Sequence, residues 1–221
     1  MNLLTVLGAR PQFIKAAAVS RAIEKSNAGL KANRDPNFIH ETIIHTGQHF
    51  DTNMSDIFFE QLCIPMPVKN LGVGGLNQGA MTGRMLELLE KEFLAYRPDW
   101  ILIYGDTNST LAAALAASKL QIPLAHVEAG LRSQNLSMPE EINRVLTDRI
   151  SNILFCPTKV AVENLRKEGF PFSVGSGSHQ RIELVGDVMY DLAIISRDMA
   201  HVKVSLDKWD LTEKGYLLCT V

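Results

Sequence analysis

The sequence has few cysteines and no excess of either charge. Its three cysteines, Cys63, Cys156 and Cys219, lie far apart and form no Cys-x-x-Cys motif, so we predict buried free thiols rather than disulfides or a metal site. The formal net charge is only -2 over 221 residues. This excludes the basic field that attracts nucleic acid or an anionic membrane surface. A few local cations would therefore have to hold any anionic ligand.

Long hydrophobic runs are absent as well. No stretch approaches the roughly 18 apolar residues of a membrane-spanning helix, and no basic segment precedes the short apolar run at the amino terminus, as a secretory signal would require. We therefore expect a cytoplasmic protein. The hydrophobic fraction of 46% and the charged fraction of 21% are those of a folded chain. Its length suits one large α/β domain, or a domain plus part of another.

Several motifs of cofactor-dependent and covalent enzymes are also missing. The first glycine turn, LGARPQFIK, has neither the GxGxxG of dinucleotide-binding folds nor the GK[ST] of a P-loop, so we predict no nicotinamide or ATP cofactor. No Gly-x-Ser-x-Gly or reactive-cysteine motif indicates a covalent nucleophile. His45 and His49 flank a turn at Thr46 and Gly47 that would separate their rings, so no metal is expected.

Short apolar strands alternate with helical segments along most of the chain. Strands are predicted at 3–7, 41–45, 100–104, 123–127, 153–155, 182–185 and 216–221, and helices at 11–26, 53–62, 78–96, 109–120, 140–150, 160–168 and 188–199. This alternation indicates a doubly wound, Rossmann-like parallel sheet of the α/β class. The polar stretch 27–37, between the first helix and the second strand, is predicted to be a surface loop.

The last predicted strand, 216–221, has no helix after it, although a parallel strand expects one to cover it. We therefore divide the chain into an amino-terminal domain at 1–200 and a linker with the first strand of a second domain at 201–221. On this reading the chain is cut short.

Polar residues follow four predicted strands, at 8–10, 46–49, 105–108 and 128. Ligands of doubly wound sheets bind beyond the carboxyl ends of the strands, so these residues should gather at one edge. The first turn would offer free N–H groups at Gly8 and a helix amino terminus, with Arg10 and Lys15 as cations, which favours a phosphate site. A tight turn with two solvated cations is an equally good interpretation.

Three carboxylates are candidates for proton transfer, and each has a structural alternative. Asp106 ends a buried strand and could cap the next helix. Glu128 ends the following strand and could pair with Arg132 or Arg144. Glu140 could be an ordinary first-turn acid of its helix. If neighbouring strands bring Asp106 and Glu128 together, they could form an acid/base pair. His126, inside an apolar strand, is interpreted as a core histidine with satisfied hydrogen bonds.

Five ordered motifs together carry a resemblance to a known family: GARPQFIK, HTGQHFD, YGDTNST, HVEAGLRS and MPEEINR. Over nearly the whole chain they resemble the UDP-N-acetylglucosamine 2-epimerase family. The resemblance implies a GT-B arrangement, in which two Rossmann-like domains face a nucleotide-sugar cleft and this chain supplies the amino-terminal one. It also implies interconversion of UDP-GlcNAc and UDP-ManNAc, for polysaccharide precursor supply, by anti elimination of UDP to 2-acetamidoglucal and syn re-addition without a cofactor.

The resemblance also assigns roles by motif position. The acid/base carboxylates would be Asp106, Glu128 and Glu140. The substrate-binding residues would be Gly8, Arg10, Lys15, Gln48, His49, Arg132 and Arg144. A second UDP-sugar could act as an activator in a regulatory pocket lined by Gln48, Arg84 and Glu141. A homodimer is the oligomeric state that the resemblance favours.

Alternatives remain within and outside this family. The HTGQHFD and MPEEINR motifs also resemble the branch that acts on UDP-2,3-diacetamido-2,3-dideoxyglucuronate. Hydrolysing relatives release free ManNAc, although these motifs favour the non-hydrolysing type. A GT-B glycosyltransferase needs only one base, so the surplus of carboxylates argues against it, and a non-catalytic phosphate-binding or assembly module is a third reading. The family's His-Arg-x-x-Asn motif and uridine-binding domain are not in this sequence, so we expect the chain alone to be inactive and to bind UDP weakly.

Overall fold

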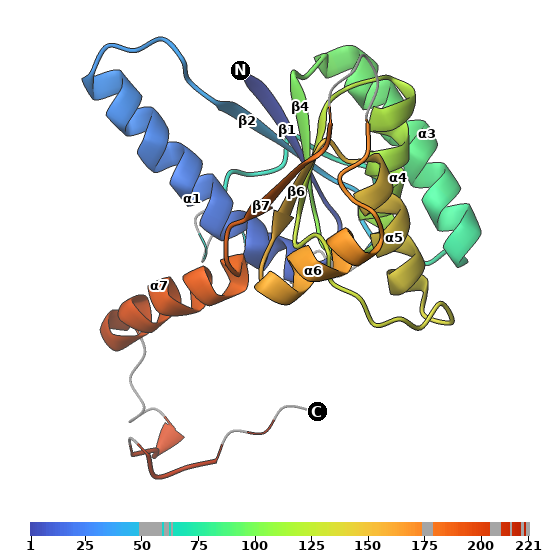
Figure 1. Ribbon diagram of the computed structural model, residues 1–221. Helices are drawn as coiled ribbons and strands as arrows, with labels where there is room; N and C mark the ends of the chain where they lie inside the picture. Colours follow the sequence, from blue (N-terminus) through green and yellow to red (C-terminus); the bar gives the residue numbers. More distant parts are fainter. Residues whose placement is uncertain are drawn as a thin grey trace.

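The computed structural model of this chain describes residues 1–48, 64–173 and 179–203 (198–203 by their backbone alone), together with residues 59, 62, 209–212, 214–217 and 219. The strands, labelled as in Figure 1, are β1 Asn2–Leu7, β2 His40–His45, β3 Lys69–Asn70, β4 Trp100–Tyr104, β5 Leu124–Val127, β6 Ile153–Cys156 and β7 Arg181–Leu184. The helices are α1 Arg10–Ala32, α3 Gln78–Tyr96, α4 Asn108–Lys119, α5 Pro139–Ile150, α6 Lys159–Lys167 and α7 Val188–Lys203.

The strands form one parallel sheet in the order β3-β2-β1-β4-β5-β6-β7. β1 pairs with both β2 and β4, so the strand order reverses between β1 and β4. In doubly wound sheets this switch point is where ligands bind. The predicted fold class, a doubly wound parallel α/β sheet, is therefore confirmed.

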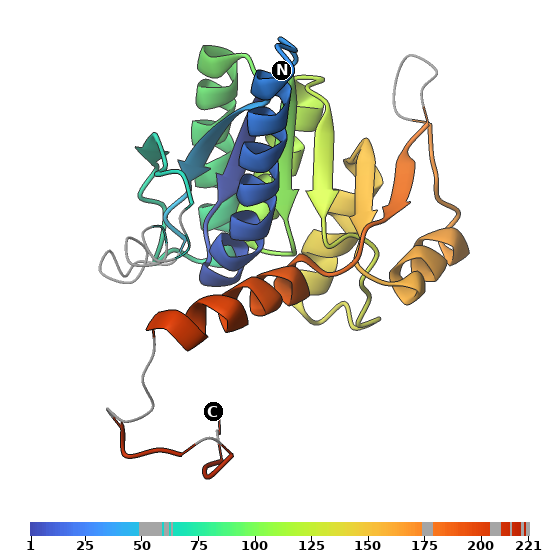
Figure 2. The ribbon, with the colours of Figure 1, turned by 90° about the vertical axis from the view of Figure 1, so that its left-hand side faces the viewer.

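Helices cover both faces of the sheet because successive residues of each strand point to opposite sides. Leu4 and Val6 join the apolar cluster beneath α3 and α4, whereas Leu3 and Leu7 join the cluster beneath α1 and α7. Figure 2 shows α1 in front of the sheet and α3 behind it. The alanines of α4, such as Ala113, are fully buried and let this helix approach the sheet closely.

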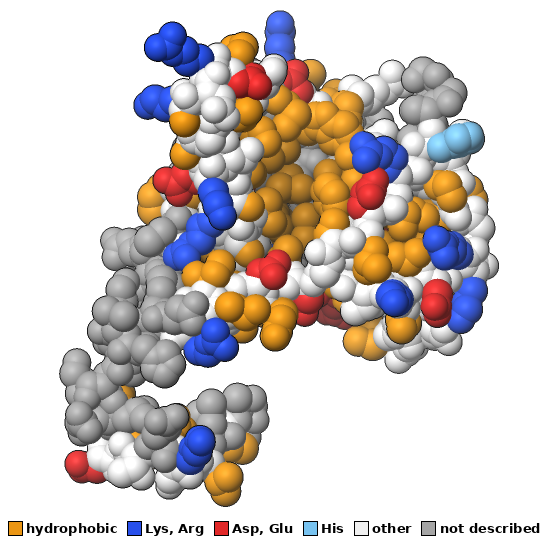
Figure 3. Space-filling view, turned by 60° about the vertical axis from the view of Figure 1, so that its left-hand side comes forward, with side chains coloured by type: hydrophobic (Ala, Val, Ile, Leu, Met, Phe, Trp, Pro, Cys, Tyr) orange, Lys and Arg blue, Asp and Glu red, His pale blue; other side chains and the backbone are white. Residues whose placement is uncertain are grey.

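The α1 face is only partly covered. Apolar side chains fill a hollow between α1 and the β7 end of the sheet (Figure 3). Trp100, Ile153 and Phe155 are partly buried residues of the cluster on this face. No helix in the described part of the chain is long and apolar enough to cross a membrane.

Two local predictions are corrected by tertiary contacts. Helix α1 continues to Ala32, so the predicted loop 27–37 is partly helical. The Asn27 side chain donates to the Ile39 carbonyl at 2.8 Å and accepts from the Ile39 N–H at 2.9 Å, which ties this helix to the start of β2. The short edge strand β3 was not predicted, because two residues are too few to show a periodic pattern.

The carboxyl-terminal prediction also changes. Of the predicted strand 216–221, the described residues Tyr216, Leu217 and Cys219 lie outside any strand. Cys219 is exposed, contrary to the predicted burial, whereas Cys156 is a buried free thiol as predicted. Burial, and then the nearby Asp148 carboxylate, raise the pKa of Cys156 to about 12. Cys63 and most of the predicted helix 53–62 lie outside the described residues, and the proposed domain division at residue 200 stays a prediction.

Candidate functional site

The site lies where neighbouring strands end. Tyr104, the last residue of β4, pairs with Val127, the last residue of β5. Asp106 and Glu128 come just after these two residues, so both lie at the same edge of the sheet. On the other side of the switch point, Leu7 of β1 pairs with His45 of β2. The polar residues that follow these strands therefore share one edge of the sheet, as the sequence predicted.

An ion pair between Lys15 of α1 and Glu128 lies at this edge. Their side chains are only 11% and 23% exposed, respectively, so solvent screens the pair less than it would a surface pair. The sequence offered Arg132 or Arg144 as the partner of Glu128, and this was wrong. Only the folded chain shows Lys15 reaching Glu128, because the two are 113 residues apart.

Gly105 makes room for that ion pair. Its φ is +63°, in the left-handed region that favours glycine. A Cβ atom at this position would lie 3.1 Å from Lys15 Nζ and 3.2 Å from Glu128 Oε2. A residue with a side chain at position 105 would therefore be strained and would crowd the ion pair, which lies beside the backbone that leads to Asp106.

We predict that Gly105→Ala destabilises the chain by about 1–3 kcal/mol, through the strained φ and the crowding of Lys15. Urea unfolding followed by circular dichroism measures the change. Gly79→Ala is the control, because Gly79 lies in α3 and a Cβ atom there would have no neighbour within 4 Å, so this variant should be neutral or stabilising. Equal stability of Gly105→Ala and the parent chain would contradict the prediction.

Asp106 belongs to a second charged group, which includes Arg144 and Glu141. Arg144 donates from Nη2 to Asp106 Oδ2 and from Nη1 to Glu141 Oε2, each at 2.5 Å. Asn143 donates to the Asp106 carbonyl at 2.8 Å. The cap of α4 is Thr107, whose side chain accepts from the Thr110 N–H. The capping alternative for Asp106 is therefore wrong. Its side chain is 31% exposed, and its carboxylate is paired with the Arg144 guanidinium.

Glu141 is an internal anchor of α5. Its side chain is 2% exposed and accepts from the backbone N–H groups of Ser133 at 3.0 Å and Gln134 at 2.8 Å. Burial by itself would raise the pKa of Glu141, but these two N–H groups and Arg144 outweigh it and lower the pKa. The neighbouring Glu140 is exposed in the first turn of α5.

We predict a pH dependence of stability from Glu141. Because its folded pKa is lowered, its contribution is present above the ordinary pKa of 4.5 and is lost as the pH falls through the folded value. Glu141→Gln should lower stability at neutral pH by about 1–3 kcal/mol and flatten the acid side of the stability curve. Urea midpoints between about pH 2 and pH 7 measure this. The exposed neighbour provides the control, because Glu140→Gln should leave the curve unchanged.

Gln12 occupies the turn that was expected to bind phosphate. Its Oε1 accepts from the N–H groups of Gly8 at 2.7 Å and Ala9 at 2.9 Å, and its Nε2 donates to the Tyr104 carbonyl at 2.8 Å and to Thr110 Oγ1 at 3.0 Å. The prediction of free N–H groups at this turn is therefore corrected. Gln12 instead joins the ends of β1 and β4 to α4 across the switch point.

Gly8 and Gln48 meet the amino terminus of α4. Gln48 Oε1 accepts from Ser109 N at 3.1 Å and from Ser109 Oγ at 2.7 Å. A Cβ atom on Gly8 would lie 2.0 Å from Ser109 Oγ and 2.2 Å from Thr46 Oγ1, so only glycine fits there. Arg10 is exposed at the start of α1.

The other predicted ligand-binding residues are spread more widely. Arg84 pairs with Glu87 at 2.6 Å on the exposed surface of α3. His49 lies outside the described residues. Arg132 forms a cluster with the buried Asp148 and His126 and the exposed Glu168, in which its guanidinium donates to both carboxylates. Burial acts to lower the pKa of Arg132, but Glu168 and Asp148 outweigh it and raise the pKa.

The sequence interpretation missed several residues of this edge. Gln12, Asn143 and Asp148 were not singled out, although each makes buried hydrogen bonds that support the site. A glutamine at the third position of a helix can accept from the backbone N–H of the cap residue, so a local signal existed for the contact of Gln12 with Ala9, although not for its contacts with Tyr104 and Thr110. Asn143 and Asp148 carry no such local signal, since their partners come from other elements.

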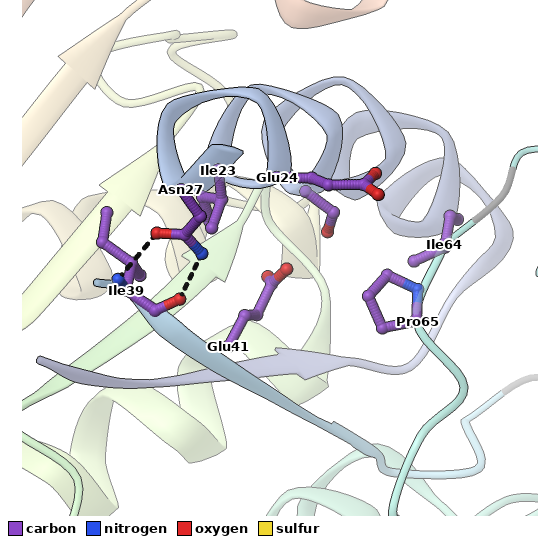
Figure 4. Close-up of a pocket in the computed structure, with 8 residues that line it drawn as sticks. Ile23, Glu24, Asn27, Ile39, Glu41, Ile64 and Pro65 are labelled. Carbon is purple, nitrogen blue, oxygen red and sulfur yellow. Dashed lines mark hydrogen bonds between the residues drawn. The ribbon is translucent and has the colours of Figure 1, made fainter. Parts of the chain in front are cut away.

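A pocket of about 530 Å³ lies elsewhere, between α1 and the start of β2. Figure 4 shows the Glu41 side chain directed toward α1 and the hydrogen bonds that join Asn27 to Ile39. Ile39 and Glu41 lie at the opposite end of β2 from His45. The charged strand ends, and not this pocket, therefore define the candidate site.

The family of this chain follows from comparison with known proteins. The family model described as UDP-N-acetylglucosamine 2-epimerase matches residues 31–221. The chain belongs to the UDP-N-acetylglucosamine 2-epimerase family. The resemblance stated from the five motifs is thereby confirmed, and the match includes Asp106, Glu128 and Glu140.

Two relatives of this 2-epimerase family member illustrate the match. UDP-2,3-diacetamido-2,3-dideoxy-D-glucuronate 2-epimerase of Pseudomonas aeruginosa is 52% identical over 221 residues, which are all of this chain and 57% of that protein. UDP-N-acetylglucosamine 2-epimerase of Methanocaldococcus jannaschii is 46% identical over 194 residues, 88% of this chain and 48% of that protein. This 2-epimerase chain thus spans about half the length of these relatives.

A solved structure gives the same result. The crystal structure of Methanocaldococcus jannaschii UDP-GlcNAc 2-epimerase in complex with UDP-GlcNAc and UDP matches with a TM-score of 0.82 at 44% identity, over 95% of this chain and 53% of that one. This 2-epimerase family member thus matches about half of that chain.

Proposed function

We propose that this chain supplies the acid/base carboxylates and the diphosphate-facing cations of a UDP-GlcNAc 2-epimerase. The observation that carries this proposal is the pair of charged groups at the ends of β4 and β5. Glu128 is paired with Lys15, and Asp106 is paired with Arg144. Two carboxylates and two cations thus meet at the edge where doubly wound sheets bind ligands.

Each residue type has a place in the proposed reaction. In the elimination, a carboxylate takes the C2 proton while the C1–O bond breaks, and UDP leaves with the electron pair, so that a C1–C2 double bond remains. Re-addition of UDP and protonation of C2 from the other face invert that carbon. The base must be ionised to accept the proton, and Asp106 and Glu128 are the proposed carboxylates for these two proton transfers.

The cations and the remaining carboxylate complete the proposal. Lys15 and Arg10 would face the departing diphosphate, whose charge grows as the bond breaks. Glu140, exposed at the amino terminus of α5, would be the third acid/base carboxylate. Gly8, Gln48, His49, Arg132 and Arg144 keep their proposed substrate-binding roles, with those of Arg132 and Arg144 limited by the ion pairs that they already form.

Further properties follow from the family and belong to the proposal. A second UDP-sugar would act as an activator beside Gln48, Arg84 and Glu141. We also propose a homodimer, a cytoplasmic location and a non-hydrolysing reaction. The buried contacts of Glu141 with Ser133 and Gln134 suggest that it would act on such an activator mainly by holding the loop before α5.

UDP-2,3-diacetamido-2,3-dideoxyglucuronate is the second candidate substrate. The 52% identity with the Pseudomonas aeruginosa relative over the whole chain supports it. The chemistry at C2 is the same for both sugars, so the two charged groups serve either substrate. The choice depends on groups that contact C3 and C6 of the sugar.

A chimaera tests the proposal and the choice of substrate. This chain replaces the matching 57% of the Pseudomonas aeruginosa relative, and the product is incubated with each UDP-sugar in deuterium oxide. We expect deuterium at C2 of the recovered substrate and formation of its C2 epimer. A glycosyltransferase would leave C2 unlabelled, and a non-catalytic module would give no turnover. Either result, with the intact relative active as a control, would reject the proposed function.

A further inference from the structure

Both ring nitrogens of His126 lie within hydrogen-bond distance of oxygen atoms. The residue is in β5 and has no exposed surface. Nε2 is 2.7 Å from the Gly105 carbonyl oxygen, and Nδ1 is 2.7 Å from Asp148 Oδ1. A carbonyl oxygen cannot donate, so Nε2 must carry a proton.

Asp148 decides the state of the other nitrogen. It is fully buried, and its Oδ2 accepts from Gly130 N at 3.0 Å and from Arg132 Nη1 at 2.7 Å. The contact with the Arg132 guanidinium is a buried salt bridge, and such a partner favours the ionised carboxylate. Asp148 Oδ1 therefore accepts as well, and Nδ1 of His126 must donate to it.

The two carboxylates that Arg132 contacts differ in exposure. Arg132 donates to Glu168 at 2.7 Å and 2.9 Å as well as to Asp148, but the Glu168 side chain is 37% exposed whereas that of Asp148 is fully buried. Of the two, it is therefore Asp148 whose charge must be compensated within the protein. Its two oxygens meet the Arg132 guanidinium and the His126 ring.

We infer that His126 is an imidazolium cation and a positioning residue, which fixes the Gly105 carbonyl and thereby the turn that carries Asp106. Its importance for catalysis rests on the proposed function, whereas its protonation does not. The hydrogen bond from Nε2 holds the peptide that follows Gly105, whose φ is +63°. Gly105 lies against the Lys15–Glu128 pair, so one fixed carbonyl keeps both proposed carboxylates in place.

The surroundings of the ring come from several elements. Asp148 of α5 contacts it directly, Arg132 acts through Asp148, and Lys15 and Glu128 lie beside Gly105. His45, buried at the end of β2, provides a contrast, because its Nδ1 accepts from Gly47 N at 3.0 Å and so carries no proton. Burial alone therefore does not produce a doubly protonated ring, and the Asp148 contact makes the difference.

Nitrogen NMR of the chain labelled in its histidine rings tests the protonation. In the folded chain we expect attached protons on both ring nitrogens of His126, because each lies 2.7 Å from an oxygen that accepts. Asp148→Asn should leave His126 with one proton, whereas Glu163→Gln, which removes an exposed carboxylate of α6 outside the cluster, should change nothing. A single proton on His126 in the parent chain would overturn the inference.

The positioning role is measured in the active chimaera. Asp148→Asn should lower kcat about tenfold or more, as for other residues that orient a site from behind, with KM within about twofold because substrate contacts remain. Glu163→Gln should leave both constants unchanged. If the Asp148→Asn variant folds and its kcat is unchanged, the positioning role of His126 is wrong. If the chimaera shows no turnover but His126 is doubly protonated in the chain, the proposed function is rejected and the protonation of His126 stands.

Discussion

Asp106→Asn and Glu128→Gln are each expected to lower turnover of the chimaera by about 10²–10⁴-fold, the usual contribution of one general acid or base. Asparagine and glutamine keep the size of each side chain but cannot accept the C2 proton. Initial rates of epimer formation, together with deuterium incorporation at C2, measure the loss. The Lys15–Glu128 and Arg144–Asp106 pairs lie at a strand edge rather than in the apolar core, so both variants should fold.

The controls separate chemistry from structure. Glu24→Gln removes an exposed carboxylate of α1 and should retain full activity. Circular dichroism and urea midpoints show whether each variant folds like the parent. If both Asp106→Asn and Glu128→Gln fold and retain rates within about threefold, the acid/base assignment is wrong, because such a small loss is far below the contribution of a general base.

Gln12→Leu is expected to destabilise the chain by about 3–5 kcal/mol. Leucine has nearly the same size but leaves the N–H groups of Gly8 and Ala9 without their partner. It also removes one of the two donors to the Tyr104 carbonyl, the other being Thr110 Oγ1. Gln12 is 1% exposed, and each buried polar group that loses its partner costs about 1–3 kcal/mol. Urea unfolding of the 221-residue chain measures the difference in unfolding free energy.

Gln78→Leu is the matched control for Gln12→Leu. Gln78 lies exposed in the first turn of α3 and accepts one hydrogen bond, from Asn108 Nδ2 at 2.5 Å. Its loss should cost about 1 kcal/mol or less. If Gln12→Leu lowers the unfolding free energy no more than Gln78→Leu does, the four hydrogen bonds of Gln12 do not hold the switch point together.

These predictions depend unequally on sequence and structure. Asp106 and Glu128 were singled out from sequence because each follows an apolar strand, a local pattern that any doubly wound sheet places at its ligand-binding edge. Gln12 was not singled out, and the N–H groups that it binds were predicted to be free. Its partners, the Tyr104 carbonyl and Thr110, are 92 and 98 residues away, so no local pattern reveals the contact.

Local sequence patterns were sufficient for the fold class, for the order of most strands along the chain and, through the five motifs, for the family. These features depend on runs of apolar residues and on turn residues, which are readable over a few positions. The folded chain was needed to show that Lys15 pairs with Glu128, that Arg144 joins Asp106 to Glu141 and that His126 contacts oxygen atoms through both nitrogens. Such pairings require the strand order and the reach of each side chain, because Arg132 and Arg144 lie much nearer to Glu128 along the chain than Lys15 does and only packing selects Lys15.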